Sequence, residues 1–206
     1  MTKFVEETYR KIANAYTREF FDDVSDTPMI DNLLERLAIK STVLDIGCGP
    51  GQFSQYLMGH GHKVTGIDTS DEMLAIARDK VPTGTFTKMD MRKLVYPDET
   101  FDACLVAYSL IHIPSSELLT TLREIIRVMK VGGIALFIVQ KGDADQILDE
   151  PLAEGEKIFV NFFSEDRFKK FLVDGGFDII EMGTMEQSNE DVLSTTVLFS
   201  IVQKKK

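Results

Sequence analysis

A glycine-rich segment with an acidic side chain in front of it is the part of the sequence best suited to chemistry. It reads VLDIGCGPG over residues 43–51. Its glycines let the backbone approach a ligand closely, and a helix starting behind them would offer free N–H groups. Asp45 stands two residues before the first glycine, where a carboxylate repels a pyrophosphate and attracts an ammonium. The G-x-G-x-G spacing differs from the G-x-G-x-x-G of dinucleotide-binding proteins, which disfavours a nicotinamide-dependent oxidoreductase.

A second acid, Asp68, ends the next β-rich run of the sequence. An acid at this point of a strand–helix–strand unit can accept both hydroxyl groups of a ribose. Together, the two acids imply a ligand with an amino-acid head, a ribose and no phosphate. S-adenosylmethionine fits that description.

The elements that must position these residues follow from apolar spacing. Three- and four-residue spacing predicts an amphipathic helix over 4–20 and a second over 30–37. Strands and helices then alternate, which indicates a doubly wound, mostly parallel α/β sheet. The last two strands, 177–182 and 194–202, have no helix between them and must be antiparallel. The other strands are predicted at 42–46, 63–67, 83–87, 101–107 and 134–139, and the other helices at 51–59, 70–80, 115–130 and 164–174.

Composition narrows the class of protein. At 206 residues the chain predicts one domain, 1–206. The formal net charge of −10 disfavours nucleic acid as a partner. With no apolar run near 20 residues and no signal peptide, we expect no membrane partner and a cytoplasmic location. Cys48 and Cys104 form no CxxC pair, and His60 and His62 lack acidic or cysteine neighbours at ligand spacing, so no metal site is expected.

Six stretches of the sequence resemble, in order, the class I S-adenosylmethionine-dependent methyltransferases, in the small group similar to ubiquinone/menaquinone-type methyltransferases. The resemblance implies a Rossmann-like seven-stranded sheet of order 3-2-1-4-5-7-6 with strand 7 antiparallel, and S-adenosyl-L-homocysteine as product. Val131 stands where the family usually has proline before strand 5, which affects a turn. The stretches are VLDIGCGPGQFSQYL (43–57), VTGIDTSDEML (64–74), MDM (89–91), FDACLVAYSLIHIP (101–114), VMKVGGIALF (128–137) and FFSEDRFKKFLVDGGFDIIE (162–181).

The same resemblance assigns a set of cofactor-binding residues. Asp45 and the loop backbone would hold the methionine part, Asp68 the ribose, and Asp90 the adenine amino group. Thr69 and Met73 would flank the adenine, while Tyr16 would close over the methionine end. The full set is Tyr16, Asp45, Gly47, Cys48, Gly49, Gly51, Asp68, Thr69, Met73, Asp90, Met91 and Tyr108.

Methyl transfer from a sulfonium needs alignment and exclusion of water more than a strong catalytic group. His112 lies in the loop after the fourth strand and is a candidate general base, with packing of that loop as the alternative. Tyr9 is a candidate pocket residue, with ordinary helix packing as the alternative. The loop lacks the Asn/Asp-Pro-Pro-Tyr signature, which disfavours a nucleobase or glutamine amino group as acceptor.

Two segments are expected to set specificity for a small-molecule acceptor. The N-terminal helical region, 1–40, is predicted to act as a lid, and its helix is expected to lack a fixed partner in the core. The acid-rich insert 141–163 is predicted to cover the substrate side, with Phe159, Phe162 and Phe163 as apolar walls, and a solvated acidic face is the alternative. A non-catalytic S-adenosylmethionine-binding regulatory or assembly protein remains the alternative function, and monomer or homodimer is left open.

Overall fold

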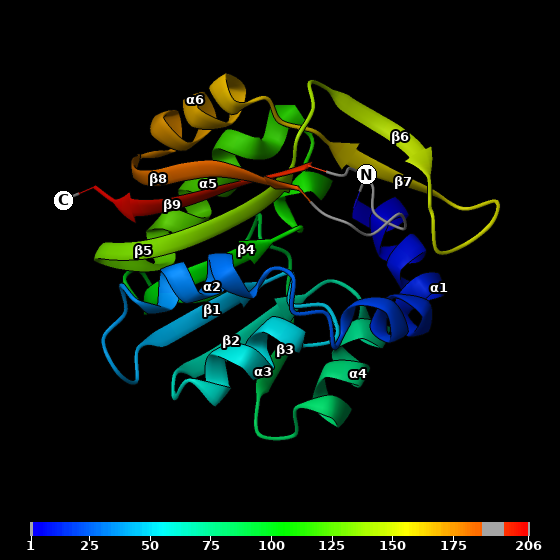
Figure 1. The fold of residues 1–206 in the computed structure, drawn as a ribbon, viewed down its shortest axis with the longest axis horizontal. Helices are drawn as coiled ribbons and strands as arrows, with labels where there is room; N and C mark the ends of the chain where they lie inside the picture. Colours follow the sequence, from blue (N-terminus) through cyan, green and yellow to red (C-terminus); the bar gives the residue numbers. More distant parts are fainter. Residues whose placement is uncertain (1, 187–195, 206) are drawn as a thin grey trace.

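The computed structural model describes residues 2–186 and 196–205 of the chain, and a seven-stranded sheet runs through its centre (Figure 1). The elements are α1 (Thr2–Phe20), α2 (Thr27–Leu34), β1 (Thr42–Ile46), α3 (Gln52–Gly59), β2 (Lys63–Asp68), α4 (Asp71–Lys80), β3 (Thr85–Lys88), β4 (Phe101–Ala107), the 3-10 turn η1 (Leu110–His112), α5 (Ser115–Val128), β5 (Met129–Gln140), β6 (Asp145–Asp149), β7 (Lys157–Asn161), α6 (Glu165–Gly175), β8 (Phe177–Glu186) and β9 (Thr196–Lys204).

The strand order of the central sheet is β3-β2-β1-β4-β5-β9-β8. The first five strands in this order pair in parallel, while β9 runs antiparallel to both β5 and β8. Because β6 and β7 form a separate two-stranded sheet, β8 and β9 correspond to the sixth and seventh strands of the predicted order. The predicted fold class and the antiparallel last strand are therefore confirmed.

Two apolar clusters hold helices on opposite faces of the sheet. On one face Leu122 of α5 and Phe168 of α6 pack with Phe137 of β5, and each of these side chains is buried. On the other face Ile30 of α2 and Leu57 of α3 belong to a second buried cluster. Each Å² of apolar surface that is buried stabilises the fold by about 25 cal/mol, so this layered packing is the main source of stability. The carboxyl ends of the parallel strands are left for a ligand.

Several helix boundaries differ from the sequence prediction. Helix α2 covers Thr27–Leu34 where 30–37 was predicted. Helix α5 ends at Val128 and not at 130, because the carbonyl groups of Arg127 and Val128 accept hydrogen bonds from Glu99 and Thr100, which directly precede β4. Thr69 and Glu72 have the spacing of a capping box, but Thr69 does not cap α4. Ser70 is the N-cap of α4, and its hydroxyl accepts the Met73 N–H at 3.3 Å. This one-residue change leaves Thr69 outside the helix.

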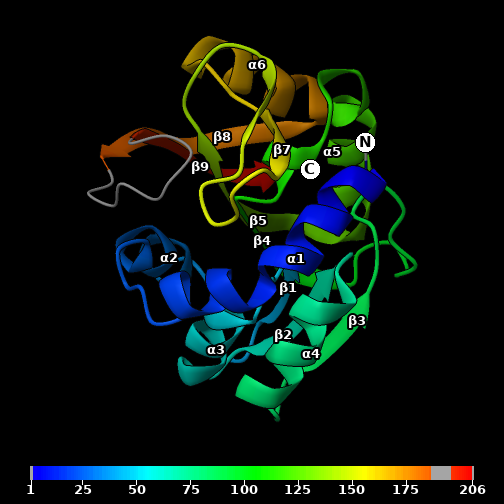
Figure 2. The ribbon, with the colours of Figure 1, turned by 90° about the vertical axis from the view of Figure 1, so that its right-hand side faces the viewer.

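The insert predicted at 141–163 contains the β6–β7 hairpin, which lies beside α1 at one end of the sheet (Figures 1 and 2). The three phenylalanines expected as pocket walls are instead in the core: Phe163 is fully buried, and Phe159 and Phe162 are 3% and 6% exposed. That prediction is wrong because Phe162 and Phe163 pack into the cluster around α5 and α6, while Phe159, which does not belong to that cluster, is buried as well. None of them lines the pocket described below.

Helix α1 packs against α4 and β7, across the carboxyl ends of the strands (Figure 2). Its Thr8 hydroxyl donates to the Lys157 carbonyl at 2.9 Å, and Lys88 pairs with Glu6 at 2.8 Å. Its expected lack of a partner is therefore wrong in this structure, since it contacts the hairpin on one side and α4 on the other.

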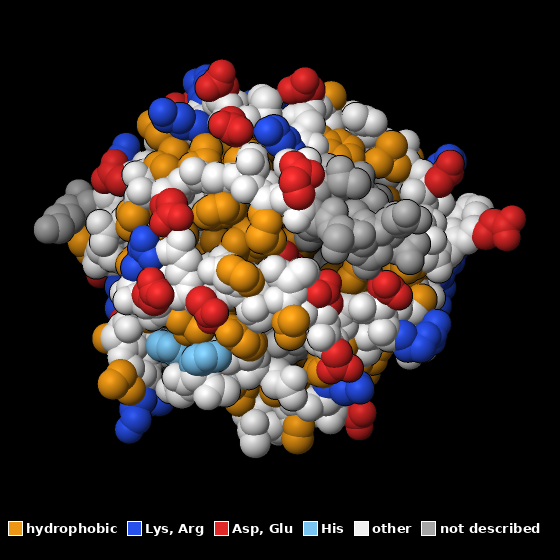
Figure 3. Space-filling view, in the orientation of Figure 1, with side chains coloured by type: hydrophobic (Ala, Val, Ile, Leu, Met, Phe, Trp, Pro, Cys, Tyr) orange, Lys and Arg blue, Asp and Glu red, His pale blue; other side chains and the backbone are white. Residues whose placement is uncertain are grey.

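On the face of the molecule shown in Figure 3, Lys and Arg side chains lie among Asp and Glu side chains and form no basic patch. Among the described helices none is long and apolar enough to cross a membrane.

Candidate active site

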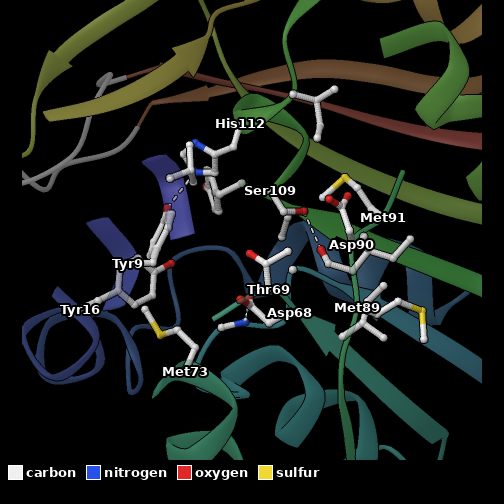
Figure 4. Close-up of a pocket in the computed structure, with 18 residues that line it drawn as sticks. Tyr9, Tyr16, Asp68, Thr69, Met73, Met89, Asp90, Met91, Ser109 and His112 are labelled. Atoms are coloured by element: carbon white, nitrogen blue, oxygen red, sulfur yellow. Dashed lines mark hydrogen bonds between the residues drawn. The ribbon is translucent and has the colours of Figure 1, made fainter. Parts of the chain in front are cut away.

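A pocket at the carboxyl ends of β1, β2 and β4 brings most of the predicted site residues together beneath α1 (Figure 4). It contains about 760 Å³ of space, part of it open to solvent. Its lining residues are Val5, Tyr9, Tyr16, Ile46, Gly47, Gly49, Ile67, Asp68, Thr69, Met73, Met89, Asp90, Met91, Ala107, Tyr108, Ser109, His112 and Ile113.

The glycine-rich loop forms the floor of this pocket. The N–H of Gly47 donates to the Ile67 carbonyl at 2.8 Å, which ties the loop to the end of β2. A Cβ added to Gly47 would lie 2.2 Å from the Cβ of Ser109, so only glycine allows the loop to approach the segment after β4. Ser109 in turn donates to the Ile46 carbonyl at 2.5 Å. The close approach of these two loops needs both the glycine and the hydroxyl.

Asp68 lies at the centre of the pocket, where its two carboxylate oxygens accept backbone N–H groups. One accepts from Gly49 at 3.0 Å and the other from Ser70 at 2.8 Å. Burial raises the pKa of Asp68, although these hydrogen bonds favour the charged form. A carboxylate has about four lone-pair sites. The Thr69 N–H also favours the charged form by hydrogen bonding, so Asp68 keeps capacity for one further donor, as a ribose hydroxyl would supply.

Asp45 is positioned differently from the sequence expectation of a carboxylate at the mouth of the pocket. It is 1% exposed, accepts the Ser54 hydroxyl at 2.6 Å, and is absent from the pocket lining, as are Cys48 and Gly51. Burial raises the pKa of Asp45 to about 7. Its carboxylate lies behind the loop, so a direct pairing with a ligand ammonium remains a prediction.

The side of the pocket assigned to adenine holds Thr69, Met73, Asp90 and Met91. Asp90 also accepts hydrogen bonds from Arg92, whose side chain reaches it at 2.5 Å. Burial alone would raise the pKa of Asp90, but the Arg92 hydrogen bonds and charge outweigh it, and the pKa is lowered. Asp90 is thus a charged acceptor at this side. The sequence analysis did not single out Arg92, because it follows Asp90 by only two positions and no apolar period marks the segment.

The opposite side of the pocket is formed by aromatic side chains from α1 and the loop after β4. The Tyr9 hydroxyl lies 2.8 Å from Nε2 of His112, and the Tyr9 and Tyr16 rings meet edge to face at 5.9 Å. Tyr108, with a φ of 54°, donates its hydroxyl to Asp26 at 2.7 Å. The candidate residues Tyr9 and His112 are thus in direct contact, although 103 residues separate them in sequence.

Comparison with known proteins identifies the family. A family model described as a methyltransferase domain matches residues 43–133. A phosphatidylethanolamine N-methyltransferase of Cereibacter sphaeroides is 33% identical over 177 residues, which cover 80% of this chain and 84% of that protein. The chain belongs to the class I S-adenosylmethionine-dependent methyltransferases.

Two further matches add detail. A malonyl-[acyl-carrier protein] O-methyltransferase of Erwinia pyrifoliae is 41% identical over 96 residues, and the chain spans only 36% of that protein's length. The structure of a Burkholderia thailandensis 1,6-didemethyltoxoflavin-N1-methyltransferase, with its substrate and S-adenosylhomocysteine bound, superposes with a TM-score of 0.80. It covers all of this chain and 89% of the other at 18% identity, which shows a shared fold.

A buried acceptor beside the pocket of this methyltransferase fits the family's cofactor. Gln52 does not line the pocket, but its Oε1 is buried without a hydrogen-bond partner among the described residues and lies 4.0 Å from the position of a Cβ on Gly49, which does line it. This orphaned acceptor beside the loop suits an ammonium or amide donor of a ligand. Gln52 was missed in the sequence because a glutamine at the start of a helix carries no spacing signal.

No group of three or more potential metal ligands occurs among the residues the structure describes.

Proposed function

We propose that this methyltransferase transfers the methyl group of S-adenosylmethionine to a small-molecule acceptor bound in the same pocket. The proposal rests on one observation, which is that two kinds of group lie on opposite sides of that pocket. Asp68 and the glycine-rich loop lie on one side, and the Tyr9–His112 pair lies on the other, beneath α1. The first side suits the cofactor, and the second leaves aromatic and polar groups for an acceptor.

In this proposal Asp68 accepts a ribose hydroxyl, while Thr69, Met73 and Met91 surround the adenine and Asp90 accepts from its amino group. The amino-acid end lies over Gly47 and Gly49, with Gln52 as an additional acceptor. Tyr16 and Tyr108 complete the predicted set on the aromatic side, with Cys48 and Gly51 in the loop and Asp45 behind it. The bound cofactor supplies a methyl group already activated by its sulfonium.

The chain's own contribution is alignment and exclusion of water. Tyr9 and Tyr16 project from α1 over the pocket, and the contacts of α1 with β7 and α4 hold it there. Closing α1 over both ligands would keep the acceptor within reach of the methyl group, and such alignment is worth up to ~7–11 kcal/mol of the barrier. The lid function of residues 1–40 is therefore part of the proposal.

No Lys or Arg is among the pocket-lining residues, and Asp68 and Asp90 are the charged ones there. An anionic acceptor would meet no cationic side chain among the lining residues, only the sulfonium of the cofactor, so we infer that the acceptor is neutral or cationic at the binding step. The charge balance of the chain supports a small molecule over nucleic acid. We place the protein in the cytoplasm, as a monomer or homodimer.

Isothermal titration with S-adenosylmethionine, S-adenosylhomocysteine and NAD tests the cofactor assignment. Binding of the first two in the micromolar range, with no binding of NAD, is the expected result. Tight binding of NAD without binding of the sulfonium compound would reject the proposal. A homocysteine-release assay with a panel of acceptors then tests turnover, and should include ethanolamine headgroups because the Cereibacter relative is named for phosphatidylethanolamine.

A further inference from the structure

Three groups from separate parts of the chain form a continuous hydrogen-bonded series on the acceptor side of the pocket. The Tyr9 hydroxyl of α1 lies 2.8 Å from His112 Nε2. The other ring nitrogen, Nδ1, lies 2.8 Å from the Phe159 carbonyl oxygen of β7. Tyr9 and His112 both line the pocket, as Figure 4 shows.

The Phe159 carbonyl oxygen determines which ring nitrogen of His112 carries a proton. A carbonyl oxygen only accepts, so His112 Nδ1 must be the donor to Phe159. Burial lowers the pKa of His112 to about 4, so the ring is neutral near pH 7 and carries a single proton. That proton is on Nδ1, and Nε2 therefore has a lone pair. The Tyr9 hydroxyl donates to this lone pair, and its own oxygen keeps lone pairs for a group in the pocket.

We propose that Tyr9 and His112 act as one proton-accepting unit, in which Tyr9 contacts the acceptor and His112 acts through it as a positioning residue. The acceptor is correspondingly an un-ionised hydroxyl or a non-basic N–H. This inference rests on the proposed function, since it concerns the acceptor of the same methyl transfer.

The proton moves along the hydrogen bonds of this series, and the bonds and charges of the step balance. The acceptor atom forms a bond to the methyl carbon, and the bond from that carbon to sulfur breaks with its electron pair left on sulfur. The acceptor's proton passes to the Tyr9 oxygen as the Tyr9 proton moves to His112 Nε2. The imidazolium then carries the charge that the sulfonium has lost, and releases its proton to water when the site opens.

The basicity of the Tyr9–His112 pair determines which classes of acceptor can be methylated. A neutral imidazole whose pKa is near 4 cannot deprotonate an alkylammonium, whose pKa near 10 is about 6 units higher. A hydroxyl or an imide nitrogen becomes strongly acidic only as it is methylated, so even a weak base can take its proton then. A phenolate or carboxylate would enter a pocket lined by Asp68 and Asp90 with no cationic side chain.

The charged and titratable groups around the pair are consistent with a neutral His112. Tyr16 and Asp68 share the pocket with Tyr9, and Glu150, which is 6% exposed, acts on Tyr9 through its charge. Burial, with the charges of these groups added, raises the pKa of Tyr9. Tyr9 therefore stays protonated in the resting site and is a hydrogen-bond donor to His112.

The direct test is nitrogen NMR of the imidazole rings, which is tractable because the chain has three histidines. The full chain saturated with S-adenosylhomocysteine should show His112 as the Nδ1–H tautomer, neutral down to about pH 5. Tyr9→Phe should leave the tautomer unchanged but shift the Nε2 resonance, because its donor is lost. An Nε2–H tautomer, titration near the ordinary pKa of 6.5, or no Nε2 shift in Tyr9→Phe would overturn the pairing.

Turnover tests the role in transfer, using phenols and cyclic imides as un-ionised acceptors and ethanolamine and benzoate as the competing classes. With a phenol or imide substrate, Tyr9→Phe and His112→Gln should each lower kcat ~10²–10⁴-fold with little change in cofactor affinity. The double variant should match the single ones within about twofold, since the two residues act as a unit. Tyr56→Phe, which removes a hydroxyl bonded to Asp31 outside the pocket lining, is the matched control and should be unaffected.

Three outcomes would overturn this role. Additive losses in the double variant would show that the residues act separately. Faster methylation of ethanolamine than of any phenol or imide, or no transfer to any phenol or imide, would reject the acceptor class. If S-adenosylmethionine itself fails to bind in titration, the proposed function fails and not this inference alone.

Discussion

Removing the carboxylate of Asp68 is the sharpest test of the cofactor assignment. A charge-assisted hydrogen bond contributes ~1.5–3 kcal/mol, so Asp68→Asn and Asp68→Ala should weaken binding of S-adenosylmethionine about 10- to 150-fold. S-adenosylhomocysteine should lose affinity by a similar factor, because both molecules carry the same ribose. A loss confined to the sulfonium compound would mean that Asp68 acts through its charge and not through the ribose.

The two substitutions differ in what they do to the protein itself. Asp68 also holds the N–H groups of Gly49 and Ser70, and leaving each of these without an acceptor costs ~1–3 kcal/mol in Asp68→Ala. Asp68→Asn keeps one carbonyl oxygen and should unfold at higher urea than Asp68→Ala. Agreement of the two affinities, despite different stabilities, would separate loss of a ligand contact from loss of structure.

The assay is isothermal titration at a temperature where urea and circular dichroism show each variant folded. Asp71→Ala is the matched control, because Asp71 is a neighbouring acid that pairs with Lys88 and does not line the pocket. Its dissociation constants should equal those of the parent chain. An unchanged dissociation constant in both Asp68 variants would refute the reasoning and assign the ribose to another acid.

Three further predictions follow from the structure. Hydrogen exchange should show residues 4–21 gaining protection when S-adenosylhomocysteine binds, whereas equal protection with and without ligand would make α1 a permanent part of the core. Asp45→Asn should stabilise the chain at pH 8 by up to about 4 kcal/mol and have little effect near pH 4, as urea unfolding would measure. The raised pKa of Asp45 means that its contribution to stability falls as pH rises from about 4 to about 7 and is level above that; a larger gain at pH 4 would contradict this. Gly47→Ala should lower the urea midpoint, because a left-handed φ of 73° and a 2.2 Å approach to Ser109 both oppose a Cβ, and an unchanged midpoint would show that the two loops separate readily.

The doubly wound, mostly parallel sheet was predictable because its signals are local, whereas the strand order was implied by the resemblance to the family. Apolar runs of strand length alternate with helical spacing, and a right-handed crossover leaves few ways to arrange them. The antiparallel end followed from the missing helix between β8 and β9. The connection at 187–195, and Ser194 at the start of the predicted last strand, lie outside the described residues.

The sequence did not predict the hairpin in the insert, and the reason is physical. β6 is mostly exposed and has an aspartate at each end, so it lacks the alternation of a half-buried strand. It becomes a strand because β7, which is buried, pairs with it. The burial of Phe159, Phe162 and Phe163 depends on that pairing, and no period in the sequence distinguishes a core ring from a pocket wall.

The sequence by itself determined the glycine loop, the acid that ends β2 and the helix that carries Tyr9, because each depends on residue type and short-range spacing. Only the tertiary structure decided that Tyr9 meets His112, that Asp45 lies behind the loop with Ser54, and that Gln52 is left without a donor. These contacts join residues on different elements. Their distances depend on how α1, α3 and the hairpin pack on the sheet, and packing is a property of the whole chain.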